Sequence, residues 1–216
     1  MARRQSISAT DGNGPSHDPV RENILTVATA EFAEHGFAGA RVDEIAAKTA
    51  TSKRMIYYHF GGKDGLYRAV LTRAYAGVRT AESIAGLDRL AVVDALRRMV
   101  EISFDYHAEH PEFVRLVMDE NIRRGVQIEA MADVEDDNRS ILAILGAILA
   151  RGAAEGVLRD GLQALDVHLA MSALSFYPVS NRYTVLSNFG RDMRAAKERH
   201  AQRATAVDLI LRYCLR

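Results

Sequence analysis

The stretch Val42–Tyr67 constrains the fold more than any other part of the chain. Ile45 gives a first short segment an apolar inner face, and Ile56 with Phe60 does the same for a second at four-residue spacing. Ser52 is a residue type preferred at helix N-caps, so the second helix is predicted to begin there. The sequence therefore predicts a helix, a tight turn and a second helix, followed at once by a third.

The outer face of the second helix is cationic and aromatic. Residues 48–63 include four Lys or Arg and no Asp or Glu. A small apolar inner face with such an outer face is typical of a helix that enters a DNA groove. The alternative is a solvated basic face beside tyrosines that pack in the core. The candidate DNA-contacting residues are Arg41, Ser52, Lys53, Arg54, Tyr57, Tyr58, His59 and Lys63.

The candidates divide by chemical type into base and phosphate contacts. We expect Lys53 or Arg54, early in the helix, to meet base edges, preferably guanine. Tyr57, Tyr58 and His59 suit phosphates. The same holds for a lysine at position 63, because a helix N-terminus already favours an anion.

Together with residues 24–37, this stretch resembles the N-terminal DNA-binding domain of TetR/AcrR-type transcriptional regulators. The resemblance covers about the first third of the chain, in the family's order and without a gap. Beyond it, only the general helical layout is similar. The matching residues are Ala28, Phe32, Gly36, Phe37, Ile45, Ala46, Ser52, Ile56, Tyr57, Tyr58, His59, Phe60, Lys63 and Leu66.

Two departures from the family pattern concern DNA geometry. Ala50 stands at the turn position where Gly or Asn is usual, and a left-handed conformation there costs an alanine about 1 kcal/mol. Ala40 and Arg41 stand where a Ser or Thr cap normally precedes the first helix of the pair. Arg41 is expected to contact a phosphate instead.

Composition limits the class of protein. The 216 residues include 28 basic and 28 acidic side chains, which argues against nucleic-acid binding through the whole surface and leaves the local patch. No apolar run reaches membrane-spanning length, and Met1–Pro19 lacks the apolar core of a secretory signal. The single Cys214 excludes an internal disulfide. We expect a soluble, cytoplasmic protein with no membrane partner.

We predict an all-α fold with two functional parts. Residues 1–19 are expected to be a disordered tail, and residues 20–65 a three-helix helix-turn-helix DNA-binding domain. Residues 66–216 form a helical bundle that, by the resemblance, binds a ligand and dimerises. Pro111 is predicted to open a helix, whereas Pro178 is predicted to end or kink one.

The helices after residue 90 suit a small-molecule effector of unknown identity. A mostly apolar cavity with a few polar groups is the usual form of such a site. Each residue of the candidate lining is also a plausible core residue. The lining set is Met99, Phe104, Leu116, Asn121, Met171, Phe176 and Tyr177.

Few sequence motifs support metal binding or catalysis. His107 and His110 share a helical face, but no third ligand is evident, so we interpret them as surface histidines and expect no metal. No nucleophile elbow, phosphate-binding glycine loop or zinc-protease pair is present. We expect neither a cofactor nor enzymatic activity.

The resemblance implies a homodimer on a double-stranded, palindromic operator, most often a repressor released by its ligand. It places the dimer interface on the helices around Leu165–Tyr177 and Ala204–Leu215. One rival hypothesis is a DNA-bound protein whose C-terminal domain engages another protein. A second is an enzyme built on a helical bundle.

Overall fold

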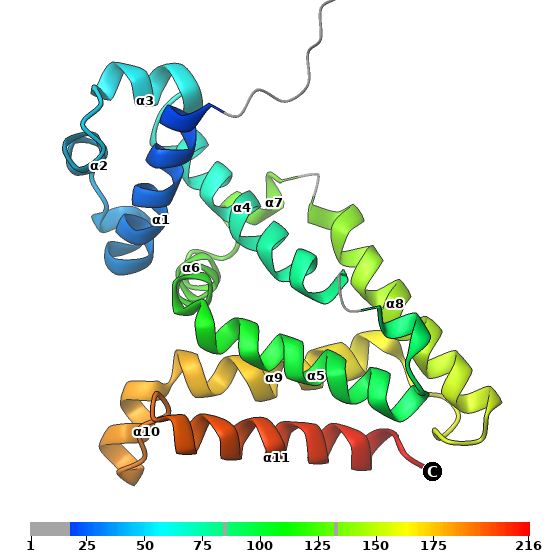
Figure 1. Ribbon diagram of the computed structural model, residues 1–216. Coiled ribbons are helices and arrows are strands. Elements are labelled where there is room, and N and C mark those ends of the chain that lie inside the picture. The colour runs from blue at the N-terminus through cyan, green and yellow to red at the C-terminus, as the bar shows by residue number, and fades with distance from the viewer. Residues whose placement is uncertain (1–17, 84–85, 132–133) are drawn as a thin grey trace, which may run out of the picture.

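The computed structural model describes residues 18–83, 86–131 and 134–216 (Figure 1). These residues form helices joined by turns, with no strand among them, which confirms the predicted all-α fold. The predicted tail lies, up to residue 17, outside the described residues. No helix in the described ranges is long and apolar enough to cross a membrane.

The first three helices build a compact unit. They are α1 (Pro19–Gly39), α2 (Val42–Lys48) and α3 (Lys53–Phe60). Asp18 caps α1, accepting a hydrogen bond from the Val20 amide at 3.0 Å. Ile24, Ile45 and Ile56 contribute one fully buried side chain from each helix. The predicted helix-turn-helix is therefore the pair α2 and α3, held by α1.

Helix α4 (Lys63–Ser83) joins this unit to the rest of the chain. Leu66, Tyr67 and Val70 are fully buried within the N-terminal core. The predicted boundary at residues 65 and 66 thus falls inside α4, whose first half packs with the DNA-binding helices.

The remaining helices form the C-terminal bundle, in which α5, α9 and α11 lie alongside one another (Figure 1). Its core includes Leu96, Met99, Leu145 and Val167, all without exposed surface. The elements are the 3-10 turn η1 (Leu87–Arg89), α5 (Val92–Glu109), α6 (Pro111–Ile122), α7 (Val126–Glu129), α8 (Val134–Ala154), α9 (Ala164–Ser180), α10 (Arg182–Phe189) and α11 (Ala196–Cys214).

The two prolines behave differently. Pro111 is the first residue of α6, as predicted, where its missing N–H costs no helical hydrogen bond. Pro178 lies inside α9, which continues to Ser180 before the short α10 begins. A proline so close to a helix C-terminus removes a single internal hydrogen bond, and the last turn is retained.

Candidate DNA-binding surface and interdomain cavity

One face of helix α3 is buried, and the opposite face is exposed to solvent. The Ser52 hydroxyl accepts a hydrogen bond from the Met55 amide at 3.2 Å, so α3 begins where the sequence predicted. Ile56 is fully buried, while Tyr57 and Tyr58 are 49% and 79% exposed. Lys53 and Arg54 are exposed as well. The outer face of α3 is therefore open to a DNA duplex.

The turn between α2 and α3 contains a strained residue. Ala50 has a φ of 50°, in the left-handed region that an alanine adopts only at a cost. The Thr51 amide donates to the Ala46 carbonyl at 3.1 Å, and the Thr49 hydroxyl donates to the Ile45 carbonyl at 2.8 Å. These hydrogen bonds hold the turn in the shape that the angle between the two helices requires.

Two of the candidate cations already have partners in the free protein. Lys53 Nζ lies 3.1 Å from Asp43 Oδ1, an ion pair between α3 and α2. Lys63 Nζ donates to the Ala38 carbonyl at 3.4 Å and lies 4.9 Å from the centroid of the Phe37 ring. A DNA contact by either lysine would therefore require that these contacts be exchanged or shared.

Arg41 and His59 occupy contrasting positions. Arg41 is exposed at the N-cap of α2, where its side chain makes no cap hydrogen bond. The His59 side chain is only 11% exposed, and its Nδ1 lies 3.6 Å from Asp18 Oδ2 at the start of α1. The sequence analysis missed this role of Asp18, although an Asp directly before Pro19 is a recognisable N-cap signal.

Helix α6 attaches the three-helix unit α1 to α3, the candidate DNA-binding unit, to the bundle. Asp119 Oδ2 accepts hydrogen bonds from the Phe37 amide and from the Tyr67 hydroxyl, each at 3.0 Å. Burial, followed by the Asp119 charge, raises the pKa of Tyr67, so this phenol stays a hydrogen-bond donor. The Arg123 guanidinium lies 3.8 Å above the Phe37 ring. Asp119 therefore ties α1 and α4 to the same point on α6.

The kink in α1 lies at Gly36, directly beside the Asp119 carboxylate. Gly36 has φ 66° and ψ 173°, and a Cβ atom there would lie 2.7 Å from Asp119 Oδ1. Both the conformation and the space require glycine. A second link, between Arg115 of α6 and Glu34 of α1, lies nearby.

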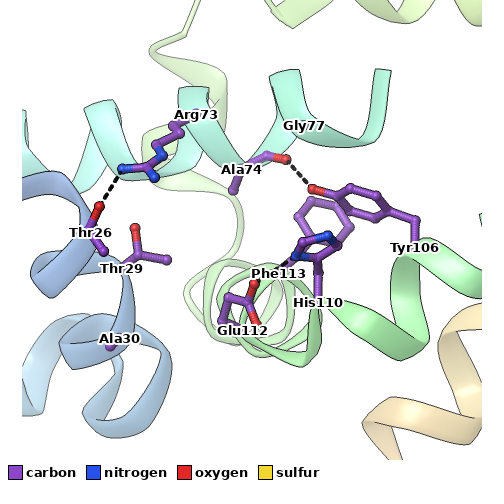
Figure 2. A pocket seen from close by; sticks show the side chains of 10 residues that line it. All are labelled: Thr26, Thr29, Ala30, Arg73, Ala74, Gly77, Tyr106, His110, Glu112 and Phe113. Carbon is purple, nitrogen blue, oxygen red and sulfur yellow. Dashed lines mark hydrogen bonds and ion pairs between the residues drawn. The ribbon is translucent and has the colours of Figure 1, made fainter. Parts of the chain in front are cut away.

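A cavity of about 520 Å³ opens between the DNA-binding unit and the bundle (Figure 2). Helix α1 forms one wall with Thr26, Thr29 and Ala30, opposite α5 and α6. Helix α4 crosses between these walls. The other lining residues come from α4, from α5 and from the start of α6: Arg73, Ala74, Gly77, Tyr106, His110, Glu112 and Phe113.

Polar groups stand at two ends of this cavity (Figure 2). At one end, Arg73 Nη1 donates to Thr26 Oγ1 at 3.1 Å. At the other, His110 Nδ1 lies 3.0 Å from Glu112 Oε1. The Tyr106 ring lies beside His110, and its hydroxyl donates to the Ala74 carbonyl at 3.4 Å. The rest of the lining is apolar or aromatic except for Thr29, whose hydroxyl donates to the Leu25 carbonyl at 2.7 Å.

The seven residues predicted to line an effector pocket are not brought together, and none of them lines this cavity. Met99, Phe104 and Met171 are buried in the C-terminal core. Phe104 also borders a separate hollow of about 140 Å³, beside Arg182 and Arg199.

The other four members of that set are spread over α6 and α9. Leu116 is buried in the N-terminal core, against the DNA-binding helices. Asn121 and Tyr177 are exposed, and Phe176 is half-buried. The cavity of about 520 Å³ instead depends on α1, which was predicted to belong to the DNA-binding domain alone.

His107 is not a surface histidine, contrary to the prediction. It is 6% exposed, and its Nδ1 lies 2.9 Å from Ser175 Oγ of α9. Burial, with a smaller effect from His168, lowers the pKa of His107 to about 4. His107 continues the buried stripe of α5 by one turn beyond Ser103 and Phe104, which the prediction overlooked. Among the described residues, no group of three or more potential ligands could hold a metal ion.

Comparison with known proteins assigns the chain to a family. Residues 24–70 match the family described as "Bacterial regulatory proteins, tetR family". Residues 93–210 match the "Tetracyclin repressor-like, C-terminal domain". The chain belongs to the TetR family. The two matched regions include the helix-turn-helix and nearly all of the bundle, so the TetR assignment rests on both parts of the chain.

Relatives within the TetR family are regulators of transcription. The chain is 34% identical to the HTH-type transcriptional repressor NicS of Pseudomonas putida, over 90% of this chain and 92% of the relative. It is 31% identical to the repressor SCO4008 of Streptomyces coelicolor, over 76% and 81% of the two chains.

A solved TetR-family structure has the same fold. The regulator PfmR from Thermus thermophilus is 27% identical, with a TM-score of 0.64 over 89% of this chain and 95% of that one. The protein is thus a DNA-binding transcriptional regulator of the TetR family, a class without enzymatic activity.

Proposed function

We propose that this protein is a cytoplasmic, homodimeric repressor that binds a palindromic operator and is released by a small molecule. The observation that carries the proposal is the exposed outer face of α3, with Arg54 and Tyr58 projecting from a helix-turn-helix. Relatives that span most of the chain, NicS and SCO4008, are named repressors.

On DNA, α3 enters the major groove. Arg54 and Lys53 meet base edges, the second after leaving Asp43. Tyr57, Tyr58, Arg41 and Lys63 contact phosphates, and Ser52 fixes the start of the helix. His59 faces Asp18, so its contact with a phosphate requires that this pair opens.

An exposed apolar stripe supports the homodimer. On α9, Leu165 and Leu169 are 53% and 56% exposed, four residues apart. On the neighbouring α11, Leu209 and Tyr213 repeat that spacing and are also exposed. Helices with such stripes bury them against another element, here the same two helices of a second copy. A two-fold dimer then reads two half-sites, because one short helix contacts too few base pairs.

Release follows from a population shift. A ligand that binds better to a dimer whose two α3 helices are wrongly spaced moves the equilibrium away from the DNA-bound form. A differential affinity of a few kcal/mol is sufficient. The cavity of about 520 Å³ favours a small molecule over the alternative, a protein partner engaged by the C-terminal domain.

Genome-wide mapping of bound DNA tests the proposal and identifies the operator. We expect a few sites that share an inverted repeat, and compounds related to the neighbouring genes should weaken binding in a mobility-shift assay. Sites without two-fold symmetry would contradict the dimeric mode of binding. Capture of a protein partner, with operator affinity unchanged by every such compound, would favour the alternative.

A further inference from the structure

We propose that the cavity between α1, α4, α5 and α6 is the effector site, and that its ligand is a small organic anion with an apolar body. The inference rests on the proposed ligand-released function. It adds where the ligand binds, what chemistry the ligand has and how its binding alters the position of the DNA-reading helix. One wall of the site is α1, the central helix of the DNA-binding unit.

The size of the cavity fits a small molecule. Its volume of about 520 Å³ lies within the range of roughly 300–1,000 Å³ usual for ligand sites. The small side chains of Ala30 and Ala74 leave the space open, and Gly77 makes room for the Tyr106 hydroxyl. The rings of Tyr106 and Phe113 meet edge to face at 5.9 Å and give the cavity an apolar wall. An apolar body therefore fills the middle of the site.

The Arg73 end of the cavity favours an anion. The Glu112 carboxylate stands at the other end, where Oε1 lies 3.0 Å from His110 Nδ1. Arg73 Nη1 bonds a neutral hydroxyl, that of Thr26, and lies 3.7 Å from Glu22. A guanidinium has five N–H donors and keeps its charge at all relevant pH values, so Arg73 retains donors for a carboxylate or a similar group.

The position of α1 explains the coupling. One side of α1 lines the cavity through Thr29 and Ala30. The other side buries Ile24 and Phe32 in the N-terminal core, to which α2, α3 and α4 also contribute. The C-terminal end of α1 is pinned to α6 by the Phe37–Asp119 hydrogen bond. A ligand in the cavity pushes the middle of α1 away from α4 and α5, and α3 moves with it.

A single introduced cysteine tests the site without knowledge of the natural ligand. Ala30 is exposed on the cavity wall, so Ala30→Cys is compatible with the fold. The native Cys214 is buried, and burial raises the pKa of its thiol to about 11, so it reacts slowly. The unmodified wild-type chain provides the blank.

The first measurement is charge selectivity, made on the free protein. Ala30→Cys is treated with sulfonatoethyl methanethiosulfonate, an anion, and with its trimethylammonium counterpart. We expect the ratio of the anionic to the cationic rate to fall by about threefold or more when Arg73→Gln is added, and the ratio to recover with Arg73→Lys. An unchanged ratio in Arg73→Gln would overturn the anion assignment.

The second measurement is operator binding by the labelled protein. Benzyl methanethiosulfonate on Ala30→Cys of α1, or on Ala74→Cys of α4, places a ring in the cavity. We expect operator affinity to fall by about tenfold or more relative to the methyl adduct. The same benzyl group on Ala130→Cys, an exposed position outside the cavity, should have no effect. Circular dichroism verifies that each adduct is folded.

The outcomes separate the inference from the proposed function. Benzyl adducts that stay folded and bind the operator as tightly as the methyl adducts would overturn the effector site, even if repression is correct. Failure of the unlabelled protein to bind any specific operator would contradict the proposed function instead. The charge-selectivity measurement uses the free protein, so its result does not depend on DNA binding.

Discussion

The carboxylate of Asp119 in α6 accepts a hydrogen bond from the hydroxyl of Tyr67 in α4, with 3.0 Å between the oxygens. The same carboxylate oxygen accepts the Phe37 amide of α1 at 3.0 Å. One side chain of the C-terminal bundle thus holds both α1 of the DNA-binding unit and α4, which joins that unit to the bundle. Movement of α6 relative to either helix must break one of these hydrogen bonds.

Removal of that carboxylate should destabilise the protein. Asp119→Ala leaves a buried phenol and a backbone amide without their acceptor, and we expect the free energy of unfolding to fall by about 2 kcal/mol. Tyr67→Phe removes only one of the two hydrogen bonds and should cost about 1 kcal/mol. Urea denaturation at fixed protein concentration measures both. Equal losses in the two variants would mean that the Phe37 amide contact contributes nothing.

Replacement of the strained turn residue should stabilise the protein. Ala50→Gly relieves the cost of a positive φ, and we expect the free energy of unfolding to rise by up to about 1 kcal/mol after the greater entropy of unfolded glycine is included. The control is Ala47→Gly in the exposed face of α2, which should lose about 1 kcal/mol. Destabilisation of similar size in both variants would show that the turn carries no strain.

Stability should depend on the ionisation of His107. Its pKa is about 4 in the fold and about 6.5 when unfolded, so between these values the unfolded state binds the extra proton. The contribution of neutral His107 is fully present above pH 6.5 and is lost as the pH falls towards 4, to a total of about 3 kcal/mol. Below pH 4 both states are protonated and this residue adds no further slope.

The variant His107→Gln isolates that effect, because glutamine does not titrate. We expect its stability curve between pH 6.5 and 4 to be flatter than that of the wild type, as measured by thermal or urea unfolding. His110→Gln, at a more exposed position, is the matched control and should retain the wild-type slope. Parallel curves for the wild type and His107→Gln would contradict the buried, neutral state of His107.

The homodimer can be broken at the exposed stripe. A charge at the centre of an apolar interface loses its hydration, so Leu169→Glu with Leu209→Glu should give monomers in sedimentation velocity. Ile122→Glu provides the control, because Ile122 is 79% exposed on α6, away from the stripe. A double variant that stays dimeric would place the interface elsewhere.

Local signals were sufficient for the elements but not for the site between them. Ser52 and Pro111 mark helix starts through chemistry that lies within a few residues, and the structure begins both helices there. The Asp119 contact joins residues 82 and 52 positions apart, and no periodicity reports such a pair. The burial of His107 could have been predicted from the periodicity of α5, whereas its partner Ser175, on a helix far along the chain, could not.

The cavity was missed because of where the sequence was divided. Treating residues 20–65 as a separate domain directed the search for a lining to the helices after residue 90. The structure uses α1 on both sides, for the DNA-binding core and for the cavity wall. Only the packing of α1 against α6, which is a tertiary feature, makes that dual use visible.

The most direct test of the central claim, that α3 reads the operator, is the affinity for operator and for unrelated DNA across a range of salt concentrations. Lys53→Ala with Arg54→Ala should reduce the ratio of specific to nonspecific affinity. The loss should correspond to about 1–3 kcal/mol of binding free energy for each lost base contact. Lys63→Ala should weaken both complexes equally and lower the salt slope by about one. An undiminished ratio in the Lys53→Ala, Arg54→Ala variant would show that α3 is not the reading helix.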